Sequence, residues 1–250
     1  MAKKYQEVPS NFSSFESYMI YKKEDVVDAF IKAHQYFFYD TCSILHHSSS
    51  AKRQNIINYL KSKVDIIIVT RTVLMELTAN SFELHPVQIQ YFKELKSSGL
   101  KVILLDEEVI YDCLKDALSI STEEANKLLG YAIKELSKSK TKINEIIESM
   151  NKTISSKFKG SNPGNKELFG TFFRYARSMK SEGDSIAEEL ILICIIVLTK
   201  IPVGRYFLIS DDMQIRSQVI RVNEYISKHH GRKEPSQLTT TSLIYKMYKD

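Results

Sequence analysis

Short apolar runs alternate with stretches of helical spacing along the first part of the chain. Three runs rich in β-branched, aromatic or other apolar residues predict buried strands, at 36–39, 64–69 and 101–105. Apolar residues at helical spacing predict helices around them, at 24–35, 51–62, 70–80 and 86–98. Strands that alternate with helices in this way predict a parallel sheet covered by helices on both faces.

The same alternation returns near the end of the chain, after a long lysine-rich interval. There the pattern predicts a helix at 184–199, a strand at 205–209 and a helix from Asp211 onward. The interval, about 107–180, is predicted to be helical and to break into two stretches at the Ser-Asn-Pro-Gly-Asn of 161–165.

The whole pattern predicts an α/β protein, a three-layer α/β/α domain with a central parallel sheet. We expect this single domain over 23–250, with the helical insertion inside it and an extended arm over 1–22 before it. With 43% hydrophobic and 26% charged residues, a chain of 250 residues has an ordinary balance and enough apolar side chains for a sizeable core.

Positive charge is concentrated in the insertion. The formal net charge of the chain is +5, whereas residues 134–180 contain eleven Lys and Arg against four Glu, an excess of seven. Such a segment is either a solvated lysine-rich face or one wall of a groove for phosphates. On the second interpretation, the residues predicted to contact nucleic acid are Lys152, Lys157, Lys159, Arg174 and Arg177.

The cysteines and the apolar stretches favour a cytoplasmic protein without a membrane partner. Cys42, Cys113 and Cys194 lie far apart and have no metal-binding spacing, so we expect reduced, buried thiols. The N-terminus has no apolar run of signal-peptide type. The most apolar stretch, at 190–203, is too short to span a bilayer and predicts a buried helix.

Carboxylates follow the predicted strands or begin the helices beside them. In a parallel α/β sheet, ligands bind at the carboxyl ends of the strands. Carboxylates brought together there repel one another and raise their own pKa values unless cations are bound, and hard divalent cations favour such ligands. A pair of these ions can activate water for phosphoryl displacement. Each acid could instead cap a helix or lie on a solvated face. The candidates are Asp40, Glu76, Asp184, Asp211 and Asp212.

Four blocks around these acids resemble, in the same order, the motifs of PIN-domain nucleases. Residues 36–45 (YFFYDTCSIL) resemble the first motif and residues 70–77 (TRTVLMEL) the second. Residues 182–187 (EGDSIA) resemble the third and residues 207–212 (FLISDD) the fourth. The insertion between the second and third blocks is much longer than in compact members of that family.

The resemblance implies a nuclease that uses Mg²⁺ or Mn²⁺ to hydrolyse phosphodiester bonds, of RNA rather than DNA. Asp40, Glu76, Asp184 and Asp212 would be the catalytic, metal-binding carboxylates. Asp211 would assist in metal binding and Ser210 would orient the fourth acid, with Thr41 and Glu182 as auxiliary residues. A toxin or defence effector with an antitoxin partner is one setting that the family suggests, and a homodimer is expected by analogy alone.

Other functions remain as alternatives. The chain could be a nucleic-acid-binding scaffold of PIN fold without catalysis, or a DNA nuclease of flap type. A haloacid dehalogenase-type phosphatase is disfavoured because Cys42 stands where its second aspartate is needed. The adjacent pairs His46-His47 and His229-His230 point to different sides, so we expect solvated or loop histidines and no metal site there. No phosphate-binding glycine loop occurs in the sequence.

Overall fold

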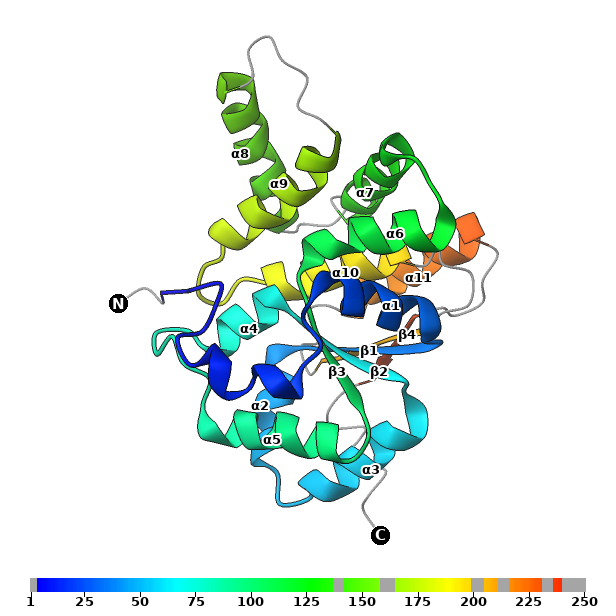
Figure 1. Ribbon diagram of the computed structural model, residues 1–250. Helices are drawn as coiled ribbons and strands as arrows, with labels where there is room; N and C mark the ends of the chain where they lie inside the picture. The colour runs from blue at the N-terminus through cyan, green and yellow to red at the C-terminus, as the bar shows by residue number, and fades with distance from the viewer. Residues whose placement is uncertain are drawn as a thin grey trace.

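A parallel sheet runs through the centre of the protein (Figure 1). The computed structural model describes residues 4–136, 142–157, 165–198, 205–210, 216–230 and 236–239. Within these residues the sheet has five strands in the order β3-β2-β1-β4-β5. The strands are β1 Gln35–Tyr39, β2 Ile66–Thr70, β3 Lys101–Leu105, β4 Arg205–Ile209 and β5 Ser236–Thr239.

The central strand is β1, whose neighbours are β2 on one side and β4 on the other. Tyr36 stacks on Tyr206 and Phe37 on Phe207 across the β1–β4 pair, with ring centroids 4.9 and 4.6 Å apart. From β1 the chain proceeds outward to β2 and β3, and later adds β4 and β5 on the opposite side. The direction of winding therefore reverses between β1 and β4, and the carboxyl ends of these two strands are where such sheets bind ligands.

Helices cover both faces of the sheet, which confirms the predicted three-layer architecture (Figure 1). On one side lie α2 (Thr41–Ser49), α3 (Arg53–Lys63) and α5 (Pro86–Ser97), and on the other side lie α1 (Lys23–Lys32), α10 (Ile186–Leu198) and α11 (Arg216–His230). All residues of α10 are buried, because the helices of the insertion pack on it from outside the sheet. In the part of the chain that the structure describes, no helix combines the length and apolarity needed to cross a membrane.

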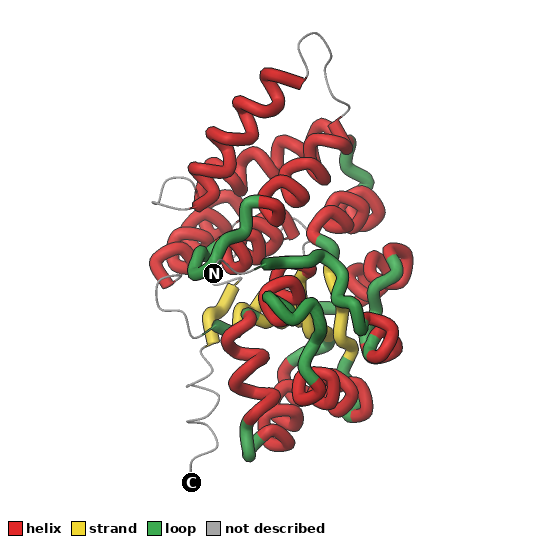
Figure 2. Tube along the Cα trace, turned by 90° about the vertical axis from the view of Figure 1, so that its left-hand side faces the viewer, coloured by secondary structure: helices red, strands yellow, loops and turns green. Residues whose placement is uncertain are grey.

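Among its described residues the insertion contains four α-helices, where two helical stretches were predicted. They are α6 (Ile110–Leu118), α7 (Thr122–Leu136), α8 (Lys142–Lys157) and α9 (Asn165–Ser178). The first break follows from local chemistry: Ser119 adopts a left-handed conformation (φ 52°), and Ser121 and Glu124 form a reciprocal capping box that begins α7. Helices α8 and α9 project away from the sheet, as Figures 1 and 2 both show.

The N-terminal arm is folded onto the domain, contrary to the expected extended arm. Its two 3-10 helices, Phe12–Ser14 and Glu16–Tyr18, flank Phe15, which is fully buried in the core. Beyond them, Ile20 forms a parallel bridge to β3, with Ile20 N donating to Val102 O at 2.8 Å. The arm thereby covers part of the exposed edge of β3.

Candidate functional site

Asp40 stands at the point where β1 becomes α2, and its side chain accepts hydrogen bonds from three neighbours. Its Oδ1 accepts a hydrogen bond from Thr41 N at 2.5 Å, as the N-cap of α2. Its Oδ2 accepts from Ser210 Oγ at 2.7 Å and from Cys42 Sγ. The residue is only 1% exposed. Because Ser210 directly follows β4, this contact joins the ends of β1 and β4 at the reversal of the sheet.

Glu76 reaches the same place from α4 (Arg71–Leu77), which begins directly after β2 because Thr70 caps it. Thr41 Oγ1 donates a hydrogen bond to Glu76 Oε2, and Lys180 Nζ lies 2.8 Å from Glu76 Oε1. Burial raises the pKa of Glu76, and the charge of Asp40 adds to this; the ammonium of Lys180 and the hydroxyl of Thr41 oppose the shift. Asp40 and Glu76 therefore lie at one site, as the sequence predicted.

Glu188 is the acid that the sequence interpretation missed. It lies on α10, and burial raises the pKa of its carboxyl to about 9, with further contributions from the charges of Asp40 and Glu76 and from a hydrogen bond with Asp40. Its Oε2 atom is buried and has no hydrogen-bond partner among the described residues. Glu188 is one helical turn after Asp184, so an i,i+4 search from the predicted acid would have found it.

Asp184 has a structural role and an indirect link to the site. Its Oδ2 accepts from Ser181 N at 2.5 Å, and its Oδ1 accepts from Ile186 N at 3.2 Å, which caps α10. The same Oδ1 pairs with Lys180 Nζ, and Lys180 in turn reaches Glu76. We call Asp40, Glu76, Asp184, Glu188 and Lys180 the carboxylate site.

The remaining predicted residues do not add a carboxylate to the described part of the site. Asp211 and Asp212 lie outside the described residues. Ser210, predicted to orient the fourth acid, donates a hydrogen bond to Asp40. Glu182 is exposed in the turn before α10 and does not belong to the buried part of the site.

The chemistry of these donors fits a hard divalent cation. Carboxylate oxygens are the ligands that Mg²⁺ and Mn²⁺ prefer, and Glu188 has a buried oxygen without a partner. Within the described residues, no three Asp, Glu, His or Cys side chains lie close enough together to hold a metal ion as they stand. Binding would therefore require side-chain movement or donors from outside these residues.

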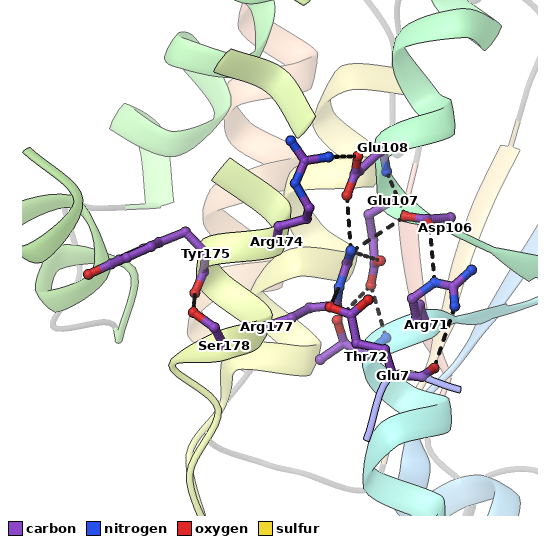
Figure 3. A network of polar contacts seen from close by, with 10 residues as sticks. All are labelled: Glu7, Arg71, Thr72, Asp106, Glu107, Glu108, Arg174, Tyr175, Arg177 and Ser178. Atoms are coloured by element: carbon purple, nitrogen blue, oxygen red, sulfur yellow. Dashed lines mark hydrogen bonds and ion pairs between the residues drawn. The ribbon is translucent and has the colours of Figure 1, made fainter. Parts of the chain in front are cut away.

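A second group of buried charges follows β3 (Figure 3). Arg177 of α9 is 1% exposed and pairs with Glu7, Asp106, Glu107 and Glu108, its Nη1 lying 2.9 Å from Glu107 Oε2. Arg71 pairs with Asp106 at 3.0 Å and Arg174 with Glu108 at 2.5 Å. We call these seven residues the arginine network.

The position of Arg177 in the arginine network contradicts its predicted contact with nucleic acid. Arg177 is enclosed by carboxylates, so its predicted role in binding phosphates does not fit its position. Arg174 is 54% exposed and pairs with Glu108. Lys152 and Lys157 lie in α8, but their side chains are not among those described, and Lys159 lies outside the described residues.

The cysteines and histidines lie mainly in structural positions. Cys113 and Cys194 are buried as expected, whereas Cys42 is half-buried beside Asp40. His46 is exposed, but the prediction of a solvated residue is wrong for His47. That histidine is fully buried, and its Nδ1 lies 2.9 Å from the hydroxyl of Tyr39. The side chains of His229 and His230, in α11, are not described.

Comparison of the chain with family models, curated proteins and solved structures found no match.

Proposed function

We propose that the protein is a metal-dependent nuclease of PIN-like type, which hydrolyses phosphodiester bonds of RNA more readily than those of DNA. The observation that carries the proposal is the convergence of Asp40, which Ser210 of the β4 end contacts, with Glu76, which Thr41 contacts, and with the buried carboxyl of Glu188. These acids come from three different segments of the chain and meet at the reversal of a parallel sheet, where ligands bind. Their mutual repulsion is the property that a bound cation would relieve.

In this proposal the carboxylates hold Mg²⁺ or Mn²⁺. Such an ion, when bound, activates water and stabilises the charge of the phosphodiester during displacement. Ser210 and the backbone of Thr41 orient the carboxylate of Asp40, and the hydroxyl of Thr41 orients Glu76. Glu188 would release its proton on cation binding, because a nearby positive charge favours the carboxylate form.

The choice of a polymeric substrate rests on charge. The net charge of +5 and the excess of basic residues in the insertion suit a polyanion. A scaffold of the same fold without catalysis is the alternative. It is less well supported, because buried acids in excess over cations destabilise a fold and are retained more readily where they bind something. An antitoxin partner and a homodimer remain predictions.

The first test is cleavage of a labelled pool of single-stranded RNA and DNA by wild type and Asp40→Asn, with Mg²⁺ or Mn²⁺ against EDTA. We expect metal-dependent cutting that falls by more than about 100-fold in Asp40→Asn, since even outer-sphere partners of a metal contribute 10–100-fold. The variant should stay folded, because it relieves carboxylate crowding. The matched control is Asp65→Asn: Asp65 accepts from His34 N and Gln35 N at the opposite, amino-terminal ends of β1 and β2.

The outcomes separate the two functions. Cutting that persists in Asp40→Asn would refute catalysis at the carboxylate site. Salt-sensitive binding of the pool without any cutting would favour the scaffold. Loss of cutting in Asp65→Asn as well would mean that the assay reports stability and not chemistry.

A further inference from the structure

Lys180 brings a positive charge into the carboxylate site. Its Nζ lies 2.8 Å from Glu76 Oε1 and pairs with Asp184 Oδ1. It also donates to the carbonyl oxygens of Ser181, at 3.0 Å, and Asp184, at 3.3 Å. The ring of Tyr5, from the N-terminal arm, lies 5.6 Å from the ammonium. The side chain is only 2% exposed.

This environment is unusual for a lysine. Lysine is almost never fully buried unless it is paired, because the ammonium loses its hydration. Here two carboxylates and two backbone carbonyls replace the water, which is the type of oxygen shell that a hard metal cation also takes. Lys180 therefore stands where a cation between Glu76 and Asp184 would be held.

The other side of the site has no such charge. Among the described residues, neither Asp40 nor Glu188 forms an ion pair, and Glu188 Oε2 lacks a partner. A divalent ion placed between Glu76 and Asp184 would have to displace the ammonium or lie against it, whereas one at Asp40 and Glu188 would meet carboxylates alone.

We propose that Lys180 is a positioning residue that takes the place of a second metal ion, so that the site binds one divalent cation, at Asp40 and Glu188. This inference rests on the proposed function, and it replaces the pair of ions expected from the sequence. Lys180 holds Glu76 and Asp184 in place and offsets part of their negative charge, and the single cation completes the site.

The test is to count Mn²⁺ bound per folded chain, from the loss of the free Mn²⁺ signal in electron paramagnetic resonance. We expect one ion for wild type and two for Lys180→Met, because Glu76 and Asp184 then lack a counter-charge. Lys180→Arg keeps the charge and should bind one. The control Lys23→Met removes an ion pair with Asp112 between α1 and α6 and should also leave one.

The wild-type count is decisive even if Lys180→Met does not fold. Two ions in wild type would overturn the inference and leave the nuclease proposal in place. A single ion in folded Lys180→Met would also overturn it. No ion in wild type would remove the metal-dependent function itself, and the inference with it.

Discussion

The carboxylate site and the arginine network both place acids beside the carboxyl ends of strands, and each includes a buried carboxylate, but they differ in counter-charge. Asp106 follows β3 as directly as Asp40 follows β1. In the arginine network three arginines face four acids. In the carboxylate site one lysine faces four acids, counting the described residues. Position after a strand thus does not separate the two groups of acids. They differ in how many Arg and Lys side chains pair with them.

The difference has an energetic meaning. Buried charges are tolerated when each has partners, as Glu107 has in Arg177 and Thr72. Among the described residues Glu188 forms no ion pair, and burial beside Asp40 and Glu76 raises the pKa of its carboxyl to about 9. We infer that the arginine network holds the insertion to the sheet. The carboxylate site, in contrast, has more negative than positive charge among its described residues.

The largest expected effect comes from breaking the arginine network with Arg177→Met. Glu107 would then be buried without a cation, so we expect the free energy of unfolding to fall by about 3–5 kcal/mol. Urea denaturation at neutral pH measures this loss. The control Arg174→Met removes a half-exposed partner of Glu108 and should cost no more than about 1 kcal/mol. Equal losses in the two variants would contradict the structural role given to Arg177.

Pairing across the arginine network could not be predicted from sequence, and the reason applies to much of the fold. Arg177 is about seventy residues from Asp106, Glu107 and Glu108 and 170 residues from Glu7, and a local pattern carries no information on such contacts. The strands β1 and β3 were predicted because their apolar runs are buried on both faces. In contrast, β5 was missed because its Ser-Gln-Leu-Thr has no apolar pattern and becomes a strand only beside β4.

Local patterns and distant contacts also separate the site residues that were predicted from those that were missed. Asp40 and Glu76 could be predicted because each stands close after a strand, so topology brings them together. Helix α2 was not predicted, since its polar Cys-Ser and His-His residues weaken the helical pattern. Glu188 was overlooked beside the apolar residues of α10, and Lys180 was counted among many lysines. Only the packing of α10 on the sheet shows that both enter the site.

A smaller effect of opposite sign is expected from Glu188→Gln. The pKa of Glu188 is about 9 in the folded protein, against 4.5 ordinarily, so the folded state binds more protons between these pH values. Stability therefore falls as the pH rises through this window. Gln keeps the shape without the charge, and it should raise the free energy of unfolding of the metal-free protein by about 2 kcal/mol at pH 7.

Urea denaturation in EDTA between pH 5 and pH 9 measures this effect. The gain should grow with pH, since wild type loses stability and the variant does not. Glu145→Gln, at an exposed pair with Lys142, is the control and should show no such gain. A variant less stable than wild type at pH 8 would show that Glu188 is charged and paired, and the contrast between the two acid groups would fail.

The smallest effect on stability gives the sharpest comparison, because one buried carboxylate of each group accepts a hydrogen bond from a buried hydroxyl. Thr72 Oγ1 donates to Glu107 Oε1, and Ser210 Oγ donates to Asp40 Oδ2, both at 2.7 Å and both buried. Removing either hydroxyl, with Thr72→Val or Ser210→Ala, should lower the free energy of unfolding by about 1 kcal/mol. The two variants should differ in cleavage: Thr72→Val should cut like wild type, whereas Ser210→Ala should lose about 10–100-fold because Asp40 is no longer oriented. Since the two hydroxyl hydrogen bonds have the same length and are both buried, a difference in cleavage would point to different roles of the two carboxylates. Equal cleavage by both variants would place Asp40 in the same structural class as Glu107.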